Sequence, residues 1–251
     1  MRRFFYVLAI GFLFFAPRGA YGQPAAQPPA TPPGPPPLRE GTINFAFVGT
    51  SGNSSTQSIG LGGDFAYRPA PWTFTTKVAY VRNESESLLK AESFDGSFKL
   101  ERAVTARLSV FGRYAFLHDE FAGIDQRHGI EGGLSYLLIN VAPHTLTVDG
   151  SLGYAHESRV VGPDLSNPTA AAGTLYKLKL SDTVEVSEDA RFVASLSQGD
   201  DWRVANIAAV TSKLASILSL KVSNTIRYVH TPVPGFEPTD TITAIALVAK
   251  F

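Results

Sequence analysis

The sequence predicts an all-β protein, a transmembrane antiparallel up-and-down β-barrel of about 12 strands. First, apolar and polar residues alternate at period two over successive segments of roughly ten residues. Second, no apolar run is longer than the one from Phe4 to Ala16, which falls short of the ~20 residues of a spanning helix. Third, the final alternating segment ends on an aromatic residue, Phe251. Together these observations favour strands over helices as the spanning elements.

The N-terminal region predicts export. Basic residues precede the apolar run, and small residues suited to cleavage follow it up to Gly22. We therefore expect a signal peptide at 1–22. A proline-rich segment at 23–39 predicts an extended periplasmic lead, and we assign 40–251 to the barrel.

The composition excludes several classes of function. The chain has 22 Lys and Arg and 22 Asp and Glu. The charged residues of the expected signal peptide are all basic. The protein that remains after its cleavage is therefore slightly acidic, and nucleic acid is not an expected partner. The chain has no cysteine, which excludes disulfides and thiolate metal sites. We expect no cofactor and no metal.

Turn residues divide the barrel region into twelve alternating segments. The predicted strands start near residues 41, 56, 72, 90, 106, 126, 144, 170, 183, 202, 218 and 240. Their connections alternate between short ones, at 68–71, 141–143 and 181–182, and longer ones, at 83–87, 156–168 and 231–240. Short periplasmic turns and longer outer loops are typical of outer-membrane barrels.

Alternation within the strands separates two faces. In 73–81, Phe74 and Val78 lie on one face and Lys77 on the other. The same pattern recurs at 93–101, 107–116 and 220–228. Glu188 departs from it because it shares a face with valines, so we expect a register slip or a β-bulge there.

The polar face carries many charges, which a dry sandwich core could not bury. We therefore expect these residues to line a lumen, where they set selectivity or form a salt-bridged plug. The candidates are Lys77, Asp95, Lys99, Arg107, Arg113, Asp149, Lys177, Lys179, Lys221 and Arg227.

Aromatic residues sort by strand end, which predicts two interfacial belts. Tyr67, Trp72, Tyr136 and Phe251 fall near the short turns, and Tyr80, Phe116, Tyr154, Trp202 and Tyr228 near the long loops.

The segment from Tyr114 to Ile139 reads YAFLHDEFAGIDQRHGIEGGLSYLLI. It resembles the signature hairpin of a bacterial family of uncharacterised outer-membrane β-barrels labelled salt-induced outer membrane proteins. The matching hairpin-loop positions are Phe121, Gly123, Asp125 and Arg127, and the Gly52-Asn53-Ser54 loop is also similar. The resemblance covers 41–251. The proline-rich lead and a lengthened loop at 156–168 depart from the family's pattern. It implies a barrel without an established enzymatic activity.

These observations predict a non-enzymatic barrel, either a narrow channel for small polar or ionic solutes or an envelope barrel linked to salt or osmotic stress. One alternative is a rim hydrolase of the protease or phospholipase type that uses His118 with Asp119 or Asp125. Another is a receptor or adhesin that works through its outer loops. The acidic residues of this rim could also bind calcium, but clustered loop acids are usually solvated.

We expect the protein to reside in the bacterial outer membrane as a monomer. Its expected partners are membrane lipid, lipopolysaccharide and the barrel assembly machinery, which would bind the C-terminal strand ending at Phe251.

Overall fold

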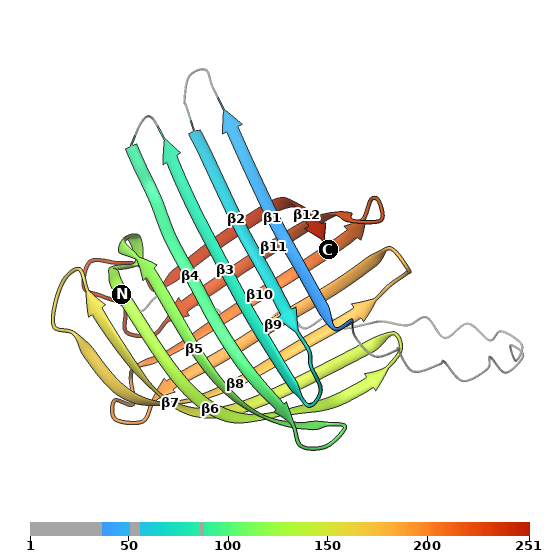
Figure 1. Cartoon of the computed structure of the whole chain (residues 1–251). Helices are drawn as coiled ribbons and strands as arrows, with labels where there is room; N and C mark the ends of the chain where they lie inside the picture. The colour runs from blue at the N-terminus through green and yellow to red at the C-terminus, as the bar shows by residue number, and fades with distance from the viewer. Residues whose placement is uncertain (1–36, 51–55, 86–87) are drawn as a thin grey trace, which may run out of the picture. The chain divides into compact units, whose positions relative to one another are not determined.

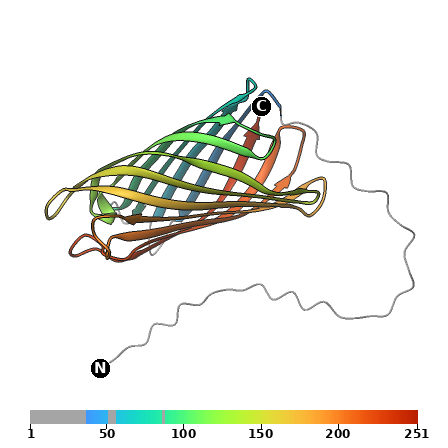
Figure 2. The ribbon, with the colours of Figure 1, turned by 90° about the horizontal axis from the view of Figure 1, so that it is seen from below.

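The computed structural model describes residues 37–50, 56–85 and 88–251. The expected signal peptide, most of the proline-rich lead and the Gly52-Asn53-Ser54 loop lie outside the described residues. Twelve antiparallel strands form one closed barrel, which confirms the predicted fold class (Figure 1, Figure 2). Among the described residues, no helix is long and apolar enough to cross a bilayer.

The strands follow one another along the chain, with a short 3-10 helix, η1 (Glu120–Ala122), between β5 and β6. Their bounds are β1 Arg39–Thr50, β2 Thr56–Tyr67, β3 Trp72–Ser85, β4 Leu88–Ala103, β5 Leu108–Asp119, β6 Ile124–Val141, β7 His144–Arg159, β8 Leu165–Lys179, β9 Val184–Ser195, β10 Trp202–Lys213, β11 Leu218–Val229 and β12 Thr239–Lys250.

Each strand pairs with its neighbours in the sequence, and β1 pairs with β12 to close the ring. This seam has four Cα pairs, the last of which joins Phe45 to Leu247. Gly41 and Phe251 extend it through N–H···O bonds of 2.9 and 3.0 Å. Beyond Phe45 the ladder stops, and β1 diverges from β12 (Figure 1).

Most strands start within about two residues of their predicted positions, but β8 does not. It begins at Leu165 rather than near residue 170, so the expected loop at 156–168 shrinks to 160–164. Pro168 lies inside the strand, opposite Tyr154 of β7. Its carbonyl accepts the N–H of Leu196, just beyond the end of β9. The backbone nitrogen of Pro168 therefore faces the point where β9 ends. No N–H is needed there for the β8–β9 ladder, so proline is tolerated.

Ion pairs between opposite strands identify the inner face. Lys77 of β3 contacts Asp189 of β9, and these strands lie across the ring from each other. Such a contact can form only through the lumen. Because directly paired residues share a face, the register then assigns every strand an inner and an outer set.

The outer set is apolar and exposed. Ile130 and Leu152, both 66% exposed, are typical of it. Further members are Ile43, Phe45, Leu61, Phe65, Val78, Phe94, Phe98, Val110, Leu134, Val222, Ile226, Ile245 and Leu247. A soluble protein rarely exposes so large a continuous apolar surface.

Glu188 lies on this outer face, and the expectation of a slip or bulge is wrong. β9 pairs with β8 and β10 without any shift of register, and Glu188 lies opposite Tyr176 and Ala208. A slip by one residue would move the ionic residues of β9 to the outer face. The strand therefore keeps its register and exposes one carboxylate.

Aromatic rings gather near both strand ends, as the sequence predicts. Near the short turns, Tyr67 lies 6.1 Å from Phe74, measured between ring centroids. Near the long loops, Trp202 lies 5.2 Å from Tyr228 and 6.0 Å from Phe192.

Candidate functional site

Ion pairs bridge the lumen between opposite walls of the barrel. Lys77 Nζ lies 3.6 Å from Asp189 Oδ2, and their side chains are 51% and 41% exposed. Arg227 of β11 reaches Asp95 of β4 at 4.0 Å and Asp119 of β5 at 3.7 Å. An exposed pair such as Lys77 with Asp189 contributes roughly 0.2–1 kcal/mol, whereas Arg227 and Asp119 are only 27% and 13% exposed. The bridging pairs narrow the lumen, and the pair of Lys77 and Asp189 holds it weakly.

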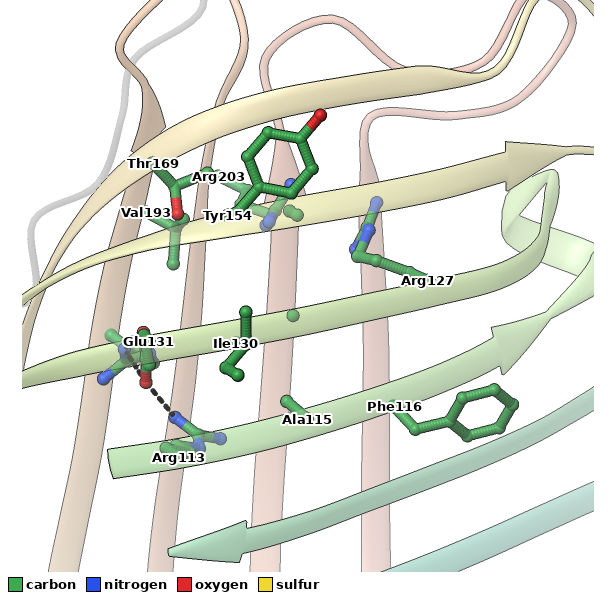
Figure 3. Close-up of a pocket in the computed structure, with 13 residues that line it drawn as sticks. Arg113, Ala115, Phe116, Arg127, Ile130, Glu131, Tyr154, Thr169, Val193 and Arg203 are labelled. Atoms are coloured by element: carbon green, nitrogen blue, oxygen red, sulfur yellow. Dashed lines mark hydrogen bonds and ion pairs between the residues drawn. The ribbon is translucent and has the colours of Figure 1, made fainter. Parts of the chain in front are cut away.

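A denser network lines the wall formed by β5 to β9. Arg191 Nη1 lies 3.1 Å from Asp149, and its Nη2 contacts Glu131. Glu131 is also 3.5 Å from Arg113 and accepts a hydrogen bond from Ser151 at 3.1 Å. Figure 3 shows the contact between Arg113 and Glu131 as a dashed line. These side chains are only 15–27% exposed, so their pairs are stronger than the half-exposed pair of Lys77 and Asp189.

A second wall cluster surrounds Glu157, which is 5% exposed. Arg127 of β6 and Arg159 of β7 both donate to this carboxylate, with Nε–O distances of 2.6 and 2.7 Å. Arg203, the second residue of β10, belongs to the inner set because it lies opposite Val193 and Val229. No hydrogen bond or ion pair joins its guanidinium to another described residue.

A cavity of about 140 Å³ lies between the two clusters. Four arginines reach it, together with Glu131 (Figure 3). Its lining includes Arg113, Arg127, Arg191, Arg203, Gly129, Glu131, Ala155, Thr169 and Val193.

The β11–β12 connection (230–238) reaches across the outer mouth. It contacts the β5–β6 connection, although the two lie on opposite sides of the ring. Val233 is 3% exposed, and Ile124 is 4% exposed. Gly123 has a φ of 78°, and a Cβ there would lie 2.7 Å from Val233 Cβ. The contact therefore needs glycine both for its backbone conformation and for its size.

The predicted lumen residues do not all have the same position. The register places most of them on the inner face, namely Lys77, Asp95, Lys99, Arg113, Asp149, Lys177, Lys221 and Arg227. Lys179 is the last residue of β8 and lies on the same side. Lys99 pairs with Glu101 at 3.0 Å and lies 4.3 Å from the ring centroid of Phe111. Arg107 differs, because β5 begins one residue later and leaves it exposed in the β4–β5 turn.

The hairpin positions that carry the family resemblance have distinct local roles. Phe121 is exposed in η1, and Gly123 ends η1 in the left-handed conformation. Asp125 accepts a hydrogen bond from His118 Nδ1 through its backbone oxygen. Arg127 binds Glu157.

The arrangement does not assemble the hydrolase pair of His118 and Asp119. These residues are consecutive in β5, so their side chains lie on opposite faces of the barrel wall. Asp119 Oδ1 accepts the N–H of Ala122 at 3.1 Å. The carboxylate of Asp125 lies 4.0 Å from His118 Nδ1. No group of three or more potential metal-binding side chains occurs in the described part of the chain.

Sequence reasoning missed Glu157, Arg159 and Arg203 as lumen residues. The first two fell inside the loop expected at 156–168. Their signal was present, because the inner face continues through Gly153 and Ala155 to both residues at period two.

Solved structures with a related arrangement include the NanC porin, at 6% identity and a TM-score of 0.47, covering 84% of this chain and 97% of that one. A bacterial polysaccharide outer membrane secretin has 9% identity and a TM-score of 0.45, covering 85% and 98%. An anion-selective porin from Comamonas acidovorans has 11% identity and a TM-score of 0.40, covering 85% and 98%. At these TM-scores the similarities add nothing to the topology described above.

No curated protein matches the chain. A family match covers residues 43–251, which is nearly the whole barrel. The chain belongs to the family described as Protein of unknown function, DUF481.

Proposed function

We propose that this protein is a bacterial outer-membrane β-barrel that acts as a narrow, gated channel for small polar or ionic solutes. The observation that carries the proposal is the inverted distribution of side chains. Apolar residues cover the outside of a closed barrel, while ionic residues cover its inside and form pairs across the lumen.

The dimensions support a membrane location. A strand of 12 residues, such as β9, is about 40 Å long at ~3.3 Å per residue, and at a tilt of about 40° it spans about 30 Å. The hydrocarbon core of a bilayer has the same thickness. A closed ladder suits that core because unpaired backbone groups are costly in lipid.

The lumen supports gating rather than a permanently open pore. The β11–β12 connection covers the outer mouth, and the bridging pairs cross the lumen. Both obstructions consist of few contacts between opposite walls. They can open without disturbing the backbone ladder, which supplies the strength of the barrel.

Salt or osmotic stress is a fitting stimulus for such a gate. Screening shortens the Debye length from about 10 Å at 0.1 M salt to about 3 Å at 1 M. The bridging pairs have separations of 3.6–4.0 Å, and the side chains of Lys77 and Asp189 are 51% and 41% exposed, so added salt weakens this pair most. High ionic strength therefore favours the open lumen.

The proposal includes a signal peptide at 1–22, a monomeric barrel in contact with lipid and lipopolysaccharide, and assembly through the strand ending at Phe251. Planar-bilayer recording of the refolded full chain tests the channel. We expect small conductance steps that grow more than proportionally with salt. A protein that folds in detergent and passes no current at any voltage or salt concentration would remove the channel and leave a structural role.

A further inference from the structure

Arg203 has an unusual environment for a half-buried side chain. Its neighbours of like charge are Arg127 and Arg191, and its neighbours of opposite charge are Glu157 and Asp201. It makes no hydrogen bond or ion pair with any of these described residues. A guanidinium has five donors, and leaving it unpaired in a half-buried site is unfavourable.

The nearby carboxylates are already engaged. Glu157 accepts from Arg127 and Arg159, and Glu131 is shared between Arg113 and Arg191. Glu157 and Glu131 are therefore each divided between two guanidinium groups, and Asp201 accepts a hydrogen bond from the amide of Asn167 at 3.3 Å. The wall around the cavity keeps an excess of positive charge, and Arg203 lies at the cavity without a counter-ion.

The cavity has the size of a small ligand. Its volume of about 140 Å³ is several times what a single water molecule needs. Besides the arginines, the hydroxyl-bearing Thr169 lines it (Figure 3). Gly129 and Ala155 also line it and leave space because their side chains are small.

We propose that this cavity binds the oxyanion group, carboxylate or phosphate, of a small solute. Arg203 supplies the principal contact, because its planar fork matches two oxygens of such a group. The free donors of Arg127 and the hydroxyl of Thr169 complete the site. The bound oxyanion takes the place of the missing counter-ion of Arg203. The inference deepens the proposed function, since the solute would reach the cavity through the lumen.

Calorimetric titration of the refolded full chain in detergent tests this proposal. Inorganic phosphate and acetate are the probes, with chloride at equal ionic strength as the reference. Phosphate should bind the wild type. Arg203→Met should weaken that affinity roughly 10- to 100-fold, the usual effect of losing a charge-assisted pair of hydrogen bonds. The control is Arg107→Met, which removes the same charge from an exposed turn and should bind phosphate like the wild type.

Arg203→Lys keeps the charge without the fork, so it should bind with intermediate affinity. Without phosphate, Arg203→Met should have a higher thermal midpoint than the wild type, because the repulsion from Arg127 and Arg191 is gone. Equal phosphate affinities of the wild type and Arg203→Met, or no phosphate binding by the wild type, would overturn the site.

Conductance separates this inference from the channel proposal. Phosphate binding that depends on Arg203 in a barrel that passes no current supports the site and refutes the channel. Current through a barrel that does not bind phosphate does the reverse.

Discussion

Neutralising Asp189 should make the lumen open more readily at low salt. Asp189→Asn removes the attraction of this carboxylate to Lys77 on the opposite wall, over an N–O distance of 3.6 Å. Because both side chains are about half exposed, the pair contributes roughly 0.2–1 kcal/mol. At ~0.59 kcal/mol for RT, this loss raises the ratio of open to closed states about 1.5- to 5-fold.

Planar-bilayer recording measures this ratio directly. At about 0.1 M salt the variant should open more than the wild type, and at about 1 M the two should converge, because salt already screens the pair. The exchange of charges in Lys77→Asp/Asp189→Lys should restore wild-type gating. The control is Asp182→Asn, which makes the same change in the exposed turn between β8 and β9.

Two results would refute this reasoning. One is identical gating of Asp189→Asn and the wild type at low salt, since the pair would then not hold the lumen closed. The other is failure of the exchanged pair to restore gating, which would assign the effect to Asp189 alone. In either case the narrowing of the lumen would have to arise elsewhere, with the β11–β12 connection as the first candidate.

Three further predictions concern stability and the outer mouth. Glu188→Leu should raise the free energy of unfolding in lipid vesicles by about 1 kcal/mol, because it removes an unpaired carboxylate from the outer face; no gain would argue against lipid contact there. Gly133→Ala should lower the free energy of unfolding by about 2 kcal/mol, since the new Cβ would lie 2.2 Å from a carbonyl oxygen. The control is Gly132→Ala, whose Cβ would meet no atom closer than 3.7 Å, so this free energy should hardly change. Gly123→Ala should make the β11–β12 connection more accessible to protease, because the new Cβ would displace Val233. The control is Gly235→Ala, since Gly235 has a similar positive φ but open space around it, and this variant should be cleaved less. Equal cleavage of the two variants would exclude the packing contact as the cause.

The strand count was predictable because its determinants are local. Alternation places every second side chain on one face, and turn residues end each strand. The start of β8 was not predictable by the same means. Pro168 reads as a strand breaker, but whether its missing N–H matters depends on where β9 ends. That is a property of the neighbouring strand, not of the segment itself.

The inner charges were predictable as a set but not as pairs. Period-two alternation places Lys77 and Arg227 on the inner face, yet it cannot say which residue faces them from the far wall. That choice depends on the stagger accumulated over all the strand pairs around the ring. Asp189 and Asp119 become partners only after the barrel closes. The isolation of Arg203 is hidden in the same way, because an unpaired charge is recognised only when all its neighbours are known.

The inner polar contacts fall into two groups that differ in strength and in position. Pairs within one wall, such as those of Glu157 at 2.6 and 2.7 Å, are close and little exposed. The pair of Lys77 and Asp189, which crosses the lumen, is longer and about half exposed. Salt or a passing ion therefore disrupts this crossing pair first, while the wall keeps its geometry. A binding site built into the wall around Arg203 would thus persist in both the closed and the open lumen, and opening would change access to the site rather than its structure.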